Sequence, residues 1–162
     1  MIMFLKGAKM EGNVHAIPIS KRKGIPKSNV AGAILIEDFG IENDAHAGKW
    51  RRQVSLLTIE SIDKMRKTLP KLRAGAFAEN ITTENFDLGL VKIGDKIKIG
   101  NCAEIEITQI GKECHTKCAI FFQVGDCVMP KEGIFAVVIK GGEIYKGDNI
   151  ALIEKIAHSE LI

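Results

Sequence analysis

The sequence predicts a mainly β protein, folded as a closed barrel or a sandwich, with helices in the minority. Runs of β-branched and apolar residues are short, and turn signals separate them at regular intervals, which is typical of these architectures. A hydrophobic fraction of 46% in 162 residues supplies enough apolar material for the core of one domain. We therefore expect a single domain over residues 1–162.

Six segments have the composition of strands: 12–20, 34–36, 52–57, 97–99, 104–110 and 134–139. In the fifth segment the motif IEIT alternates, which predicts one face in the core and one in water. The last segment, IFAVVI, is continuously apolar, which predicts burial on both faces. The KGGE that follows it predicts a hairpin turn. Two Gly-Asp pairs, in IGDKIKI and KGDNIAL, predict similar turns that each lead into a strand.

The segment TIESIDKMRKTL predicts one amphipathic helix, which begins after Thr58 and ends at Pro70. A threonine can cap the free amides of a first turn, and proline ends a helix. The apolar side chains share a face at helical spacing: Ile59, Ile62, Met65 and Leu69. We expect this face to cover the core, with an ion pair between Glu60 and Lys64 on the outside.

The overall charge excludes several classes of partner. A net charge of +3, without a long basic run, disfavours a dedicated nucleic-acid or membrane binder. No apolar stretch approaches the roughly 18–20 residues of a membrane span, and the first residues lack the pattern of a signal peptide. The glycines form neither a Walker nor a dinucleotide motif. We therefore expect a cytoplasmic protein, with no nucleic acid or membrane as partner.

The stretch GKECHTKCAI (residues 111–120) places two cysteines and a histidine within five positions. A zinc site would need four ligands, and only one tight cluster exists. A disulfide requires α-carbons within about 7 Å, whereas an extended segment would separate Cys114 and Cys118 by roughly 13 Å. A reactive or metal-ligating thiolate is the third interpretation, because Lys112, His115 and Lys117 would lower the pKa of a neighbouring thiol.

Free cysteines are also common as small buried hydrophobic side chains. We expect this role for Cys102 and Cys127, which lie outside the cluster. For Cys114 and Cys118 the polar surroundings favour a thiolate with a chemical function.

The order of motifs along the chain resembles that of the MOSC domain, the C-terminal module of molybdenum cofactor sulfurases, which also occurs as a stand-alone bacterial protein. The similar segments are NDAHAGKWRRQVSLLTIESI (43–62), GAFAENITTENFDL (75–88), KIGDKIKIG (92–100), the cysteine stretch and MPKEGIFAVVIKGGEIYKGDNI (129–150). Each motif is weak alone, but their serial match is specific, and it covers residues from about 10 to 153.

The resemblance implies a barrel-like, mostly antiparallel β fold with a few short helices, and a cysteine that carries sulfur or ligates molybdenum. In relatives that bind the metal, an apolar pair directly follows the ligating cysteine. Cys118, followed by Ala119 and Ile120, fits that pattern better than Cys114 does. We therefore expect Cys118 to be the reactive thiolate and the metal ligand, with Cys114 as a resolving or auxiliary thiol.

The molybdenum cofactor, a molybdopterin, presents a phosphate and a polar pterin, which require cationic or amide donors. We expect six residues to supply them: His46, Arg52, Gln53, Asn80, Thr82 and Lys117. Arg52 is the best candidate for the phosphate because its guanidinium is a planar fork of donors. A structural role is an open alternative for His46, and a turn role is favoured for Asn80.

The resemblance implies a protein that binds the cofactor or carries sulfur toward it, with a sulfur donor or a molybdoenzyme as partner. The alternatives are a non-catalytic module that hands over the cofactor and a small molybdenum-dependent reductase of N-hydroxylated compounds. The larger reductases carry an additional β domain, and the full sulfurases carry a pyridoxal-phosphate domain. These residues contain no counterpart of either domain, which disfavours independent reductase activity, leaves room for a smaller carrier or delivery role, and predicts no pyridoxal phosphate bound to this chain.

Overall fold

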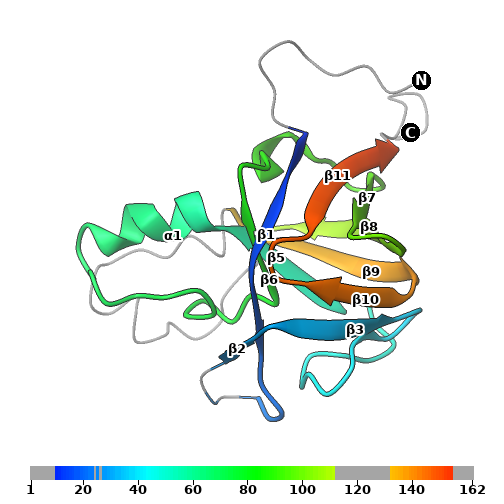
Figure 1. Cartoon of the computed structure of the whole chain (residues 1–162), viewed down its shortest axis with the longest axis horizontal. Helices are drawn as coiled ribbons and strands as arrows, with labels where there is room; N and C mark the ends of the chain where they lie inside the picture. The colour runs from blue at the N-terminus through cyan, green and yellow to red at the C-terminus, as the bar shows by residue number, and fades with distance from the viewer. Residues whose placement is uncertain (1–9, 24, 26, 112–131, 155–162) are drawn as a thin grey trace.

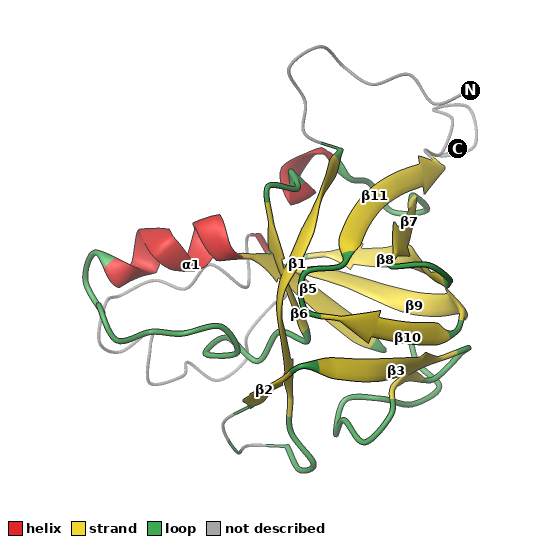
Figure 2. Cartoon of the chain, in the orientation of Figure 1, coloured by secondary structure: helices red, strands yellow, loops and turns green. Residues whose placement is uncertain are grey.

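The computed structural model describes residues 10–23, 25, 27–111 and 132–154. In chain order, the elements of this part of the chain are β1 (Glu11–Ile19), β2 (Ser28–Val30), β3 (Gly32–Ile36), β4 (Gly40–Ile41), β5 (Val54–Thr58), α1 (Ile59–Arg66), β6 (Ile81–Glu84), the short 3-10 helix η1 (Leu88–Leu90), β7 (Lys96–Ile99), β8 (Ala103–Ile110), β9 (Ile134–Lys140), β10 (Gly142–Tyr145) and β11 (Asn149–Glu154). Figure 2 shows the predominance of strands over helices in this part of the chain.

Seven strands close into a barrel in the order β11-β7-β8-β9-β5-β6-β1, and β1 pairs back with β11 (Figure 1). The pair β5–β6 is parallel, and the other six pairs around the barrel are antiparallel. Closure leaves none of these seven strands with an open edge along its paired length. The predicted closed, mostly antiparallel barrel is therefore confirmed.

A three-stranded sheet, β10-β3-β4, lies beside the barrel, and β2 pairs with the last residues of β1 (Figure 1). The predicted hairpin at KGGE is wrong, because β10 pairs with β3 and not with β9. The reason is a close approach of backbones: a Cβ atom at Gly141 would lie 2.8 Å from the carbonyl oxygen of Leu35. The glycines let the chain cross β3 at this distance instead of folding back on β9.

The barrel interior holds the main core. In β8, Ile105 and Ile107 are buried while Glu104 and Glu106 are partly exposed, which confirms the predicted alternation. In β9, the first three residues are buried on both faces, since Ile134 and Ala136 point into the barrel core and Phe135 belongs to a second apolar cluster beneath α1. The burial predicted for this strand is therefore confirmed over its first half.

Helix α1 covers the outer face of β5 and β9 and begins as predicted. The Thr58 hydroxyl accepts a hydrogen bond from the Ser61 amide at 3.0 Å. The helix ends at Arg66, one turn before the predicted end, where the Thr68 amide forms a tighter bond to the carbonyl three residues earlier, that of Met65, at 3.2 Å. The predicted Glu60–Lys64 pair is wrong: Lys64 Nζ contacts Glu132 at 2.9 Å instead.

The two Gly-Asp turns have the same construction, as predicted. Gly94 and Gly147 have φ angles of 97° and 92°, which favour glycine. In each turn the aspartate side chain accepts from the amide three residues earlier, at 2.9 Å for Asp95 and 2.7 Å for Asp148.

Within the described ranges, the structure contains no helix with the length and apolar character needed to cross a membrane.

Candidate functional site

A buried ion pair anchors the loop between β4 and β5, which carries several of the predicted site residues. Lys27 Nζ lies 2.9 Å from Asp44 Oδ1, and the two side chains are 2% and 1% exposed. Asp44 also accepts hydrogen bonds from the backbone amides of Ser20 and His46, at 3.1 and 3.0 Å. Every oxygen of this carboxylate is therefore used, as a buried charge requires.

The environment of Asp44 lowers the pKa of its carboxyl well below the usual range. Burial alone would raise this pKa, but hydrogen bonds from His46, Lys27 and Ser20, together with the positive charge of Lys27, outweigh the burial. Asp44 is thus an anion at any pH near neutrality, and it holds the loop in one conformation.

His46 extends from this anchor toward the surface, with 31% of its side chain exposed. Its Nδ1 atom lies 3.2 Å from Lys27 Nζ. Nδ1 also lies 3.6 Å from Asp44 Oδ2, so this side of the ring faces the buried ion pair. Nε2 is therefore the ring nitrogen that a ligand can contact.

Trp50 and Arg52 form a stack beside His46. The Trp50 indole donates to the His46 carbonyl at 2.9 Å, and the Arg52 guanidinium lies 4.6 Å from the Trp50 ring centre. The same guanidinium lies 5.7 Å from the Phe135 ring centre, and Lys23 Nζ lies 5.7 Å from Trp50. Cation–π contacts of this kind hold the planar arginine side chain in place and leave its donors for other partners.

Three buried polar atoms around Phe135 have no hydrogen-bond partner in the part of the chain that the structure describes: Arg52 Nε, Asn80 Nδ2 and Gln109 Oε1. The Arg52 guanidinium lies over the Phe135 ring. Gln109 on β8 pairs with Phe135, and Asn80 is bonded to Ser55 on β5, which also pairs with Phe135. An unsatisfied buried polar atom costs about 1–3 kcal/mol. The buried polar groups around Phe135 therefore include two donors and one acceptor whose hydrogen-bonding capacity the described residues leave unused.

Asn80 combines a structural contact with a free donor. Its Oδ1 atom accepts from the amide and the hydroxyl of Ser55, at 3.1 and 3.2 Å, which ties the chain before β6 to β5. Its Nδ2 atom is the orphaned donor described above. These bonds join two distant segments and are not the local turn bonds favoured from the sequence, and cofactor contact stays a prediction.

Gln53 and Thr82 are fully buried, and their polar atoms bond to other parts of the protein. Gln53 donates to Asp38 at 3.0 Å and accepts from the Val138 amide at 2.9 Å. Thr82 donates to Glu79 at 2.7 Å. Neither side chain contacts Arg52 or His46 in these bonds, and their predicted contact with a cofactor stays a prediction.

The residues of the predicted thiol chemistry, which are Cys114, Lys117 and Cys118, lie outside those that the structure describes, and so does Cys127, for which a small buried side chain is expected. The described residues on either side of them are close together, since the Gly111 amide donates to the Gly133 carbonyl at 2.7 Å. Gly111 lies two residues after Gln109 and Gly133 two residues before Phe135, so these two described residues are close in sequence to the groups around the orphaned atoms. Among the described residues there is no group of three metal-ligating side chains.

Cys102 is exposed, in the turn between β7 and β8, and the expectation of a small buried side chain is wrong for it. Ile99 at the end of β7 pairs with Ala103 at the start of β8, so Cys102 lies in the turn that joins the two strands, where it faces solvent.

A cavity of about 630 Å³ lies at the end of the barrel where α1 begins. Its lining includes Ser61, Lys64, Leu88, Ile110 and Glu132, and none of the predicted site residues. We place the candidate site at Arg52 rather than in this cavity, because the polar groups of Ser61, Lys64 and Glu132 already bond to one another.

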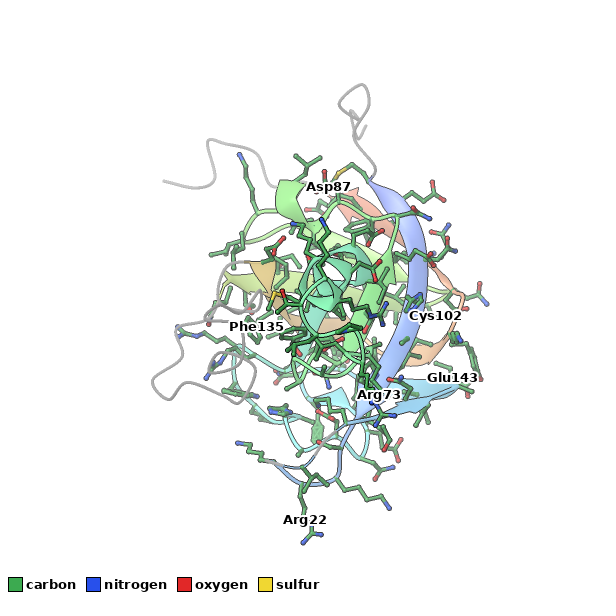
Figure 3. All side chains as sticks on the ribbon, turned by 90° about the vertical axis from the view of Figure 1, so that its left-hand side faces the viewer. Arg22, Arg73, Asp87, Cys102, Phe135 and Glu143 are labelled. Atoms are coloured by element: carbon green, nitrogen blue, oxygen red, sulfur yellow. The ribbon has the colours of Figure 1, made fainter. Side chains whose placement is uncertain are left out.

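Two parts of the site, Lys27 and Trp50, were not predicted from the sequence. Lys27 lies in a polar loop, and no local pattern marks it as the buried partner of Asp44, 17 residues away. Trp50 lies within the motif that contains His46 and Arg52, and its position two residues before an arginine was the available signal. Figure 3 shows Phe135 on the face of the molecule from which α1 projects.

Comparison with known proteins finds a matching family model and similar solved structures. The family model of the MOSC domain matches residues 43–151, which contain the anchor Asp44, His46, Trp50, Arg52 and Asn80. No curated protein matches the sequence.

Solved structures share the fold. The YuaD protein from Bacillus subtilis is 18% identical, with a TM-score of 0.75, over 91% of this chain and 98% of that one. YiiM from Escherichia coli is 19% identical, with a TM-score of 0.64, over 90% and 71% of the two chains. YiiM from Geobacillus stearothermophilus is 21% identical, with a TM-score of 0.65, over 88% and 75%.

Proposed function

Because the chain belongs to the MOSC domain family, which is associated with the molybdenum cofactor, we propose that this protein binds that cofactor beside Arg52 and His46. Arg52 and His46 contact its phosphate and pterin, and the thiolate of Cys118 ligates the metal. Cys114 serves as the auxiliary thiol, and Lys117 adds positive charge.

The observation that carries the proposal is the orphaned Nε atom of Arg52. Two aromatic rings hold the guanidinium, and no described residue accepts from Nε. A phosphate oxygen is the acceptor that suits this donor best, because a charge-assisted hydrogen bond is about twice as strong as a neutral one. The described residues therefore fit an anionic pterin cofactor.

The remaining polar groups suit the pterin. His46 presents Nε2, Asn80 donates from Nδ2, and Gln109 accepts at Oε1. A pterin ring presents both donors and acceptors along its edge, so it can satisfy all three. When bound, the cofactor would supply the redox chemistry of molybdenum, and the role of this chain is to hold and orient it.

The test is the molybdenum and pterin content of protein purified without oxygen from molybdenum-replete cells. We expect the wild-type protein to retain the cofactor, and Arg52→Gln and Cys118→Ala to retain much less. Lys98→Gln is the matched control, because it removes one exposed positive charge on β7, away from the site. Equal cofactor content in all four proteins would contradict the proposal.

Sulfur carriage is the second candidate, favoured by the lysines and the histidine next to Cys114 and Cys118 in the sequence. In this version the Cys118 thiolate attacks the sulfane sulfur of a donor, and the donor's thiolate leaves. Mass spectrometry should then find a protein one sulfur atom heavier after incubation with the donor, and no such species with Cys118→Ala. A lack of this species, combined with turnover of an N-hydroxylated substrate, would favour a reductase, and a lack of both would favour a handover module.

A further inference from the structure

A second cavity, of about 390 Å³, lies between β1, β2, the end of α1 and the turn that joins β10 to β11. The titratable side chains that line it are basic: His15, Arg66, Arg73 and Lys146. No carboxylate lines it among the residues that the structure describes. Three separate segments of the chain thus bring the cationic side chains of Arg66, Arg73 and Lys146 to one cavity, and a fourth contributes His15.

Arg66 is fixed in position by its neighbours. Its Nε atom donates to the Leu72 carbonyl at 2.7 Å, and its Nη1 atom donates to Asp63 at 2.6 Å. These bonds leave Nη2 without a hydrogen-bond partner among the described residues. An arginine held in this way loses little conformational entropy when it binds an anion.

Arg73 and Lys146 are exposed, and neither forms an ion pair with a described residue. Like charges that share a cavity repel one another. Arg66 and His15 each have a carboxylate neighbour outside the lining, Asp63 and Glu84, whereas a bound anion would supply the missing counter-charge for Arg73 and Lys146.

The backbone next to this cavity contains a β-bulge, an irregularity that is common beside functional sites. The pairing of β1 with β6 shifts register between Val14 and Ala16, which makes His15 the extra residue of a β-bulge. Bulges are over-represented next to binding sites, where they redirect a side chain. The His15 ring lines the cavity, and its Nδ1 atom is 3.5 Å from Glu84.

The remaining residues that line the cavity have small side chains. Ala16, Val30, Ala31 and Ala74 supply apolar wall, and Asn29 supplies an amide. The volume lies within the range of about 300–1,000 Å³ that small-molecule sites occupy. We propose that this cavity binds the phosphate group of a small phosphorylated molecule, gripped by Arg66, Arg73 and Lys146.

Phosphate suits the cavity better than a single carboxylate does. Two guanidinium groups and an ammonium group match a doubly charged anion with several acceptor oxygens. The site shares no residue with the Arg52 site, and Figure 3 shows Arg73 and Phe135 apart from each other on the face that carries α1. The two proposals can therefore fail independently.

Isothermal titration calorimetry at constant ionic strength provides the test, with inorganic phosphate, pyrophosphate and a sugar phosphate as probes. We expect saturable binding of at least one probe, and about a tenfold or greater loss of affinity in Arg73→Gln/Lys146→Gln. Lys98→Gln should bind the probe as the wild type does. The probe that binds most tightly distinguishes free phosphate, a diphosphate and a phosphate ester as the source of the group.

Three results would overturn the proposal. They are the absence of saturable binding by every probe, equal affinity in the double variant, and an equal loss of affinity in Lys98→Gln. The melting temperature without a ligand is the control for folding. We expect the double variant to melt at the wild-type temperature or slightly above it, because two mutually repelling charges are removed; a much lower temperature would indicate a structural role and would also overturn the proposal.

Discussion

Replacing Asp44 with asparagine should destabilise the protein strongly, although the two side chains have nearly the same shape. The substitution leaves the Lys27 ammonium buried, with its side chain 2% exposed and without a counter-charge. Removing one partner of a buried ion pair costs about 3–5 kcal/mol. A domain of this size has a free energy of unfolding of about 5–15 kcal/mol, so the loss would be a large part of the total.

Urea unfolding, followed by fluorescence in the presence of a reductant, would measure this effect. With an m-value of about 2 kcal/mol/M, the midpoint should fall by about 1.5–2.5 M at pH 7. The double variant Lys27→Met/Asp44→Asn is the control, because it leaves no buried charge. We expect it to lose less stability than the sum of the two single variants, which is the signature of direct coupling.

The difference between wild type and Asp44→Asn should also depend on pH in one direction. The pKa of Asp44 is lowered in the folded state, so the carboxylate contributes its full stabilisation above the unfolded pKa of about 3.9. This contribution is lost progressively as the pH falls below that value. A loss below about 1 kcal/mol at pH 7, or a difference that grows on acidification, would refute the reasoning.

Three further changes test the fold and the anchoring of the site. Thr58→Ala removes the side-chain cap of α1 and should cost about 1 kcal/mol in urea unfolding, whereas Thr58→Ser should restore most of it. Gly141→Ala should lower the free energy of unfolding by about 1–3 kcal/mol, because the new Cβ atom would lie 2.8 Å from the Leu35 carbonyl oxygen. An unchanged urea midpoint would mean that β3 can shift to accommodate the new atom. Glu79→Leu removes the acceptor of the Gly75 amide and the Thr82 hydroxyl, so we expect a loss of about 1–3 kcal/mol, with no change in m if the fold is kept.

The local patterns of the sequence were sufficient for most of the elements. Alternation in IEIT, the apolar run at the start of β9 and the cap at Thr58 each depend on neighbouring residues, and each was predicted correctly. The pairing of β10 with β3 was not predictable in this way, because it depends on two backbones that are distant in sequence and meet at Gly141.

The same distinction applies to the candidate site. His46 and Arg52 lie in one motif, and the structure holds them near one another through Trp50. The buried partner of Asp44 and the orphaned atoms around Phe135 come from segments far apart in the chain, so no local pattern revealed them. The role of Cys118 rests on the sequence and the family resemblance.

The central claim is that Arg52 Nε donates to the molybdenum cofactor, and nuclear magnetic resonance of the arginine Nε–H groups tests it most directly. The Arg52 signal, assigned by its disappearance in Arg52→Lys, should shift on titration with the cofactor and saturate together with binding. An Arg52 signal that stays in place while the cofactor binds would contradict the claim.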